Sequence, residues 1–347
     1  MKRGVPTLIV TLMALVMSAC APTLQRPALP EPGFAGPHLE DHTFVALDGT
    51  RLALTRWDVE KGNPWAVIVG IHGMNDYANT FHLAAPWWAA RGVATLAYDQ
   101  RGFGRSPHRG IWAPDALRIE DLRTFVALAR RQYPGIPVAV VGESLGGAVA
   151  IEAFASDHPP DADRLILAAP AVWGWTSQPL LNRSLLWLAE GFAPSHVFVP
   201  PRWVTNHIAA SDNGDELIAM GRDPLMIWGA RTDALYGLVT TMQHAQNEVG
   251  GIKRATLYQY GAHDGVIPPS ATRSAVRHLS PMARTAYYPD GWHLLLRDRR
   301  AELVWADILS FIRDPVGALP SGAAGLPQSL ARRRGRHPPS TAASFTP

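Results

Sequence analysis

A serine flanked by glycines is the pattern in this chain that most directly indicates chemistry. Ser144 lies in Gly142-Glu143-Ser144-Leu145-Gly146, between an apolar strand-like run and a helix-like stretch. A serine hydroxyl is a poor nucleophile at neutral pH, so an enzyme that uses one holds it on a sharp turn within reach of a base. Glycines at 142 and 146 lack Cβ atoms and let the strand and the helix pass close together. The pattern predicts a nucleophile elbow with Ser144 as the nucleophile.

An acid and a base for such a serine follow later in the chain. Asp264 comes after the strand-like run 257–260, and His293 comes after the run 285–288. A histidine can take the proton from the serine and return it to the leaving group, while a carboxylate holds the imidazole in one tautomer. Asp290 is a second candidate for the acid, on the same loop as His293. The chain order is therefore serine, acid, histidine.

The strand-like runs alternate with helix-like ones through the middle of the chain. Runs typical of buried strands lie at 66–71, 93–98, 137–142 and 164–168, and helix-like runs lie at 78–90, 117–132 and 145–156. This alternation predicts an α/β fold, a mostly parallel sheet with helices on both faces, whose ligands bind at the carboxyl ends of the strands. Before it, Asp48-Gly49 between two strand-like runs predicts a hairpin.

Several further motifs accompany the elbow. A loop that follows the run 66–71 reads His72-Gly73-Met74-Asn75-Asp76, and a glycine-punctuated loop follows the run 93–98. With the elbow, the late acid and the late histidine, these motifs make the chain resemble the α/β-hydrolase family over residues 41–313. Within that family it is similar to the monoacylglycerol lipase and lysophospholipase-like group of serine aminopeptidase-like hydrolases. It departs from many of those relatives in having Asn75 where they have glycine.

The resemblance implies a role for each of these residues. The acid stands at the end of the preceding strand in this fold, which favours Asp264 over Asp290. The backbone N–H groups of Met74 and Leu145 are expected to stabilise the oxyanion, and His72 and His263 are expected to be structural. The implied reaction is hydrolysis of carboxylic esters of monoacylglycerol-like or lysophospholipid-like substrates through an acyl-enzyme, with no cofactor and no metal.

An apolar segment interrupts the alternation at about 171–230, where relatives insert a helical cap over the active site. Most of its aromatic residues are expected to pack the cap against the core, and some are expected to line the entrance. A cap rich in apolar surface favours an acyl chain over a charged substrate. The tryptophans of this segment are Trp173, Trp175, Trp187, Trp203 and Trp228.

Residues 1–20 read as a targeting segment. A positive start precedes an apolar run too short to span a bilayer, which needs ~20 residues. Cys20 is the single cysteine of the chain, and its position at the end of this run resembles a bacterial lipobox. We expect Cys20 to carry lipid and to anchor the protein to the cell envelope, at the periplasmic face of an outer membrane; ordinary secretion as a soluble protein is the alternative.

The two ends of the chain differ in composition from the predicted domain. Residues 21–40 are rich in proline and are expected to form a tether, and residues 314–347 are expected to be a disordered basic tail. The formal net charge of +3 lies largely in the termini, so no nucleic-acid partner is expected.

Three other functions remain open. An aminopeptidase or amidase would need cap carboxylates gathered to bind an amine, but those present, such as Glu216 and Asp223, read as solvated helix residues. An acyltransferase would pass the acyl group to an alcohol in place of water. A catalytically silent, membrane-tethered binding protein would keep the fold without the chemistry.

Overall fold

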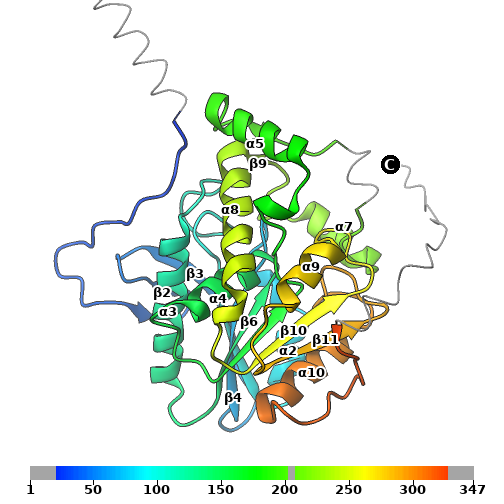
Figure 1. The fold of residues 1–347 in the computed structure, drawn as a ribbon. Helices are drawn as coiled ribbons and strands as arrows, with labels where there is room; N and C mark the ends of the chain where they lie inside the picture. The colour runs from blue at the N-terminus through cyan, green and yellow to red at the C-terminus, as the bar shows by residue number, and fades with distance from the viewer. Residues whose placement is uncertain (1–20, 202–207, 327–347) are drawn as a thin grey trace, which may run out of the picture.

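The computed structural model describes residues 21–201 and 208–326 (Figure 1). The described residues contain a nine-stranded sheet with the strand order β1-β2-β3-β5-β4-β6-β7-β10-β11. Its strands are β1 His38–Leu39, β2 Thr43–Val45, β3 Arg51–Trp57, β4 Ala66–Ile71, β5 Val93–Tyr98, β6 Val138–Glu143, β7 Arg164–Ala168, β10 Thr256–Gly261 and β11 Ala283–Tyr288.

The sheet is parallel from β5 to β11 and antiparallel at the end that begins with β1. This confirms the predicted mostly parallel sheet. Strands β2 and β3 form the predicted hairpin, and Gly49 in its turn has φ 79°, a region that glycine enters without steric cost. Because the parallel strands run in one direction, the loops that follow β4, β6, β10 and β11 lie at one edge of the sheet.

Helices cover both faces of the sheet. The helices outside the cap are η1 Ala78–Phe81, α2 Ala84–Ala89, α3 Asp115–Gln132, α4 Leu145–Ala155, α8 Thr232–Glu248, η3 Val249–Gly251, α9 Pro269–Val276 and α10 Ala301–Arg313. Successive residues of β4 alternate between the two sides of the sheet. Val67 and Val69 pack in one core with α3, α4, α8 and α9, whereas Ile68 packs in a second core with α2 and α10.

The cap lies between β7 and α8, as predicted, and is largely helical. It contains η2 Trp175–Ser177, α5 Leu180–Phe192 and α7 Gly214–Arg222. It also contains β8 Val197–Phe198, which pairs with β9 Ala230–Arg231 in a small antiparallel sheet that the helix-like pattern did not indicate. Helix α5 packs on α8 above the rest of the domain (Figure 1). Trp203 falls outside the described residues.

The segment predicted to be a tether is bonded to the domain near both of its ends. Leu24 forms a β-bridge with Trp112, the side chain of Gln25 is buried, and β1 pairs with β2. The backbone N–H of Thr23 also donates to Asp233 at 3.1 Å. The expectation of a tether is therefore wrong for residues 23–25 and 38–39, which bond to the domain, whereas most of the residues between them are exposed.

Residues 314–326, the first part of the segment predicted to be disordered, are ordered against the domain. Leu319 and Leu326 are buried, Ala324 forms a β-bridge with Tyr287 of the edge strand β11, and Arg284 donates to the carbonyl of Gly317 at 2.6 Å. Two isolated leucines gave no periodic signal, yet together with the β-bridge and the hydrogen bond they hold this segment on the sheet edge. Residues 327–347 lie outside the described residues.

The predicted targeting segment and Cys20 also lie outside the described residues. Within residues 21–201 and 208–326, no helix has the length and apolar character needed to cross a membrane.

Candidate active site

Ser144 occupies the junction between β6 and α4 in a strained conformation. Its φ of 51° and ψ of −115° are rarely adopted by residues with a side chain. The flanking glycines make this turn possible by allowing close packing. A Cβ on Gly146 would lie 2.2 Å from the carbonyl oxygen of Ile71, and one on Gly142 would lie 2.6 Å from the carbonyl oxygen of Gly146. The sequence therefore folds here as the elbow that its glycines predicted.

The structure brings Ser144, His293 and Asp264 into one hydrogen-bonded chain. Nε2 of His293 lies 3.0 Å from Oγ of Ser144, and Nδ1 lies 3.0 Å from Oδ2 of Asp264. Because an ionised carboxylate can only accept, the proton lies on Nδ1 and Nε2 is left to accept from the serine hydroxyl. The other oxygen of Asp264 accepts from the backbone N–H groups of Val266 and Ile267, which fixes the carboxylate.

Asp290 and His263 lie elsewhere. Asp290 is exposed and pairs with Arg300, while His263 stacks on Trp292 with ring centroids 5.1 Å apart. The geometry thus joins His293 to Asp264 and leaves Asp290 on the surface.

The loop expected to supply part of the oxyanion site lies next to the serine. A Cβ on Gly73 would be 3.3 Å from Cβ of Ser144, and Met74 follows directly. Asn75 has φ 64°, in the left-handed region that glycine and asparagine tolerate best, so asparagine can replace the glycine of many relatives without changing the loop.

His72 supports this loop from beneath. It is fully buried; its Nε2 accepts from the backbone N–H of Gln100 at 2.8 Å, and its Nδ1 lies 2.8 Å from the carbonyl oxygen of Gly73. Burial lowers the pKa of His72, so the imidazole is neutral and holds the loop backbone. This agrees with the structural position expected from the sequence.

A buried arginine beside the site was not anticipated. Arg297 donates to Asp76 at 2.7 Å and to Glu143 at 3.0 Å, and lies 3.8 Å from Glu216 of α7. All four side chains are buried. Arg297 thereby joins the histidine loop to the residue before Ser144, to the oxyanion loop and to the cap. The position of Arg297 directly after the apolar run Leu294-Leu295-Leu296 is a sequence signal of burial, but the sequence does not predict the partners of its side chain.

A cavity of about 250 Å³ lies next to the oxyanion loop and under the cap. Met74, Trp112 and Ile227 are among its lining residues, and Arg109 and Arg231 also line it. The backbone N–H of Ile227 donates to the carbonyl oxygen of Asn75 at 3.0 Å, which ties the cap to the loop.

The outer surface of α5 is strongly apolar. None of its described side chains is fully buried, and a groove of about 490 Å³ lined by Trp175, Trp187 and Tyr236 runs between α5 and α8. The exposed large apolar residues of α5 are Leu180, Leu181, Leu185, Trp187, Leu188 and Phe192.

Comparison with known proteins identifies the family. The model of the Hydrolase_4 family, described as serine aminopeptidase, S33, matches residues 62–300. The chain belongs to this family. Its relatives place it in the monoacylglycerol lipase-like group of α/β hydrolases, and this family membership supports an ester hydrolase.

Two curated relatives and one solved structure illustrate the similarity. The chain is 28% identical over 278 residues to a monoacylglycerol lipase of Mycolicibacterium smegmatis, which covers 78% of this chain and 96% of that protein. It is 29% identical over 175 residues to phospholipase YtpA of Bacillus subtilis, covering 49% and 64%. A soluble variant of monoglyceride lipase from Saccharomyces cerevisiae shares the fold, with a TM-score of 0.66 and 18% identity over 84% of this chain and 99% of that chain.

Proposed function

We propose that this Hydrolase_4 member is a serine hydrolase that cleaves carboxylic esters of monoacylglycerol-like or lysophospholipid-like substrates. The observation that carries the proposal is the chain of two 3.0 Å contacts from Ser144 through His293 to Asp264. In this mechanism His293 removes the hydroxyl proton as Ser144 attacks the ester carbonyl, and the alcohol leaves with that proton. Water then hydrolyses the acyl-enzyme with the same base.

The electrostatics around the serine suit this reaction. Ser144 Oγ faces the backbone of the loop that contains Met74, and Leu145 begins helix α4, whose N-terminal N–H groups favour developing negative charge. The apolar groove on α5 and the cavity beside Met74 supply surface for an acyl chain. The names of the relatives, monoacylglycerol lipase and phospholipase, agree with that substrate class.

The family description as a serine aminopeptidase makes amide hydrolysis the second candidate. An aminopeptidase needs free carboxylates to bind the substrate ammonium group. Glu216, which the sequence suggested was solvated, is instead buried and paired with His82 and Arg297, and Asp223 accepts from the hydroxyl of Tyr77. These carboxylates already have partners, which favours esters over aminoacyl amides.

The nucleophile is tested with a fluorophosphonate probe on the purified protein. Ser144→Ala is expected to abolish labelling and hydrolysis of a monoacylglycerol and a lysophospholipid, while circular dichroism and Tm stay those of a folded domain. A panel that adds aminoacyl amides separates the two candidate functions. Labelling that persists in Ser144→Ala would exclude Ser144 as the nucleophile.

The acid is tested by a matched pair of substitutions. Asp264→Asn is expected to lower kcat by about 10⁴, because the amide favours the wrong tautomer of His293. Asp290→Asn removes an exposed partner of Arg300 and is expected to leave kcat within about twofold. Steady-state rates on a short soluble ester measure both, and a larger loss in Asp290→Asn would move the acid to the histidine loop.

We also propose that Cys20 is lipidated and anchors the enzyme to the bacterial cell envelope at the periplasmic face of the outer membrane. Support comes from its place after the apolar run 5–17 and from the exposed apolar side of α5, which fits an enzyme that meets its substrate in a membrane.

A further inference from the structure

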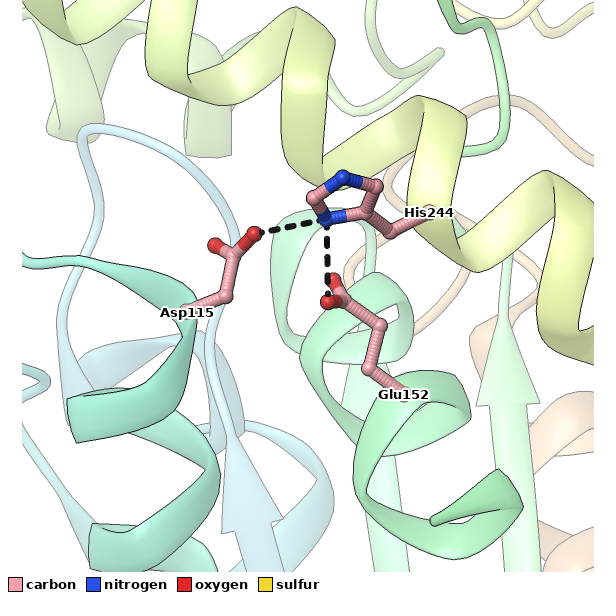
Figure 2. A group of neighbouring side chains, drawn as sticks. All are labelled: Asp115, Glu152 and His244. Atoms are coloured by element: carbon pink, nitrogen blue, oxygen red, sulfur yellow. Dashed lines mark hydrogen bonds and ion pairs between the residues drawn. The ribbon is translucent and has the colours of Figure 1, made fainter.

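Three helices bring together two carboxylates and an imidazole away from the serine site. Asp115 is the first residue of α3, Glu152 lies in α4 and His244 lies in α8 (Figure 2). Nδ1 of His244 is 3.1 Å from Oδ2 of Asp115 and 3.5 Å from Oε2 of Glu152. We propose that these three side chains form a binding site for a divalent transition metal, and that Zn²⁺ is the cation that fits it best.

The spacing of the three ligand atoms matches metal coordination. Around a zinc ion with bonds of ~2.1 Å, neighbouring ligands of a tetrahedron lie roughly 3.4 Å apart. The two measured separations from Nδ1, 3.1 and 3.5 Å, bracket that value, and all three ligand atoms lie within 4.8 Å of one another. A metal fits between them with small side-chain adjustments, and the half-exposed imidazole leaves the fourth position open to water.

The second oxygen of Asp115 is held as in many metal sites. Oδ1 accepts from Nη2 of Arg118 at 2.7 Å and from Oγ1 of Thr241 at 2.5 Å. These bonds fix the carboxylate so that Oδ2 is directed toward His244 (Figure 2). Outer partners of this kind orient a metal-binding carboxylate and do not compete for the metal.

Glu152 gives independent support for a cation at this position. Its side chain is 5% exposed, and its Oε1 is buried with no hydrogen-bond partner among the described residues. A buried carboxylate without a partner is costly. Burial, together with the neighbouring carboxylates of Asp115 and Glu248, raises the pKa of Glu152 to about 9 against the opposing charge of Arg118.

The donor set selects the metal. Mg²⁺ and Ca²⁺ prefer oxygen ligands alone, whereas one imidazole with two carboxylates suits Zn²⁺ and its neighbours in the transition series. The ion would join α4, which begins after Ser144, to α3 and to α8, which supports α5 of the cap. Its role would be to stabilise the scaffold, because Glu152, the ligand on α4, lies about two helical turns from the serine.

The test measures zinc binding and Tm on the whole purified protein after treatment with a chelator. Calorimetric titration with ZnCl₂ is expected to give one site per chain, and Zn²⁺ at about a hundred times its Kd should raise Tm by about 5 °C. Mg²⁺ should not. Glu152→Gln and His244→Ala should each weaken zinc binding at least about tenfold, since the loss of even an outer partner of a ligand typically does so.

His158→Ala is the matched control, because the side chain of His158 is exposed and lies in the loop that follows the end of α4 at Ala155. It should bind zinc and gain Tm as the wild type does. Circular dichroism checks that each variant is folded. Equal binding by His244→Ala and the wild type would assign the zinc to other surface histidines, and a wild-type Tm that does not respond to zinc would leave the group as an ion-pair cluster. Either result overturns the proposal.

Discussion

Two opposite influences act on the imidazole of His293. Burial lowers its pKa, and the carboxylate of Asp264 raises it, assisted by Glu143; together they leave the pKa above its ordinary value. A base in this position is more basic than a free histidine, yet the buried carboxylate keeps Nε2 directed at Ser144. The strained backbone of Ser144 and this paired imidazole are the two local features on which the proposed chemistry depends.

We predict a pH dependence of kcat/KM that follows from this shift. The reaction needs neutral His293, so kcat/KM should rise with pH through an apparent pKa above ~6.5. Rates on a short soluble ester between pH 5 and 9 measure it. Asp264→Asn removes the charge that raises the pKa, so its residual activity should titrate at a lower pH. A midpoint that is unchanged in Asp264→Asn would contradict this account.

Stability should move in the opposite direction. A histidine whose folded pKa is raised contributes stability that is fully present below its unfolded pKa and is lost as pH rises through the folded pKa. The protonated form of His293 is therefore the more stabilising and the less active one. As pH rises through the folded pKa of His293, activity should increase while the contribution of His293 to the free energy of unfolding decreases.

At the scale of elements, Arg297 connects four parts of the molecule. Its guanidinium group lies between the end of β6, the loop after β4 and helix α7, and the residue itself belongs to the histidine loop. The pKa of Arg297 is raised further above its ordinary value by Asp76 and Glu143 despite burial. The group is therefore permanently charged and fixes the relative positions of those elements.

We predict that Arg297→Met lowers the free energy of unfolding by about 3–5 kcal/mol, because it leaves the carboxylates of Asp76 and Glu143 buried without their cation. Arg300→Met is the matched control: Arg300 pairs with Asp290 on the surface, and its loss should cost at most about 1 kcal/mol. Urea denaturation measures both. Adding Glu143→Gln to Arg297→Met should recover part of the loss, and equal effects of the two arginine substitutions would contradict the assignment.

Arg297 also marks the limit of what the sequence could predict. The elbow, the chain order of Ser144, Asp264 and His293 and the parallel sheet follow from local patterns, because each depends on glycine positions and short apolar runs. Ion pairs between residues 76, 143, 216 and 297 depend on how distant segments meet, and no spacing in the chain encodes that. The contacts of residues 23–25, 38–39 and 314–326 with the domain escaped prediction for the same reason.

At the scale of the whole molecule, we predict that Cys20 governs where the enzyme is found. Wild-type protein should fractionate with membranes and incorporate labelled fatty acid, and Cys20→Ser should lose both properties while it keeps its activity on a short soluble ester. Activity on vesicle lipids should fall more than activity on the soluble ester, since anchoring raises the local concentration of enzyme at the substrate. Unlipidated wild-type protein beginning at Pro22 would support ordinary secretion.

The hydrogen bond from Thr23 to Asp233 gives that anchor a geometry. Asp233 lies in the first turn of α8, immediately after β9, and β9 pairs with β8, where Val197 and Phe198 are exposed. Two residues, Ala21 and Pro22, lie between Cys20 and Thr23. The three Cα–Cα steps from Cys20 to Thr23 span at most about 11 Å. A lipidated Cys20 would therefore keep the capped end of the domain within a short distance of the bilayer. The enzyme would then present the same side to the membrane on every encounter.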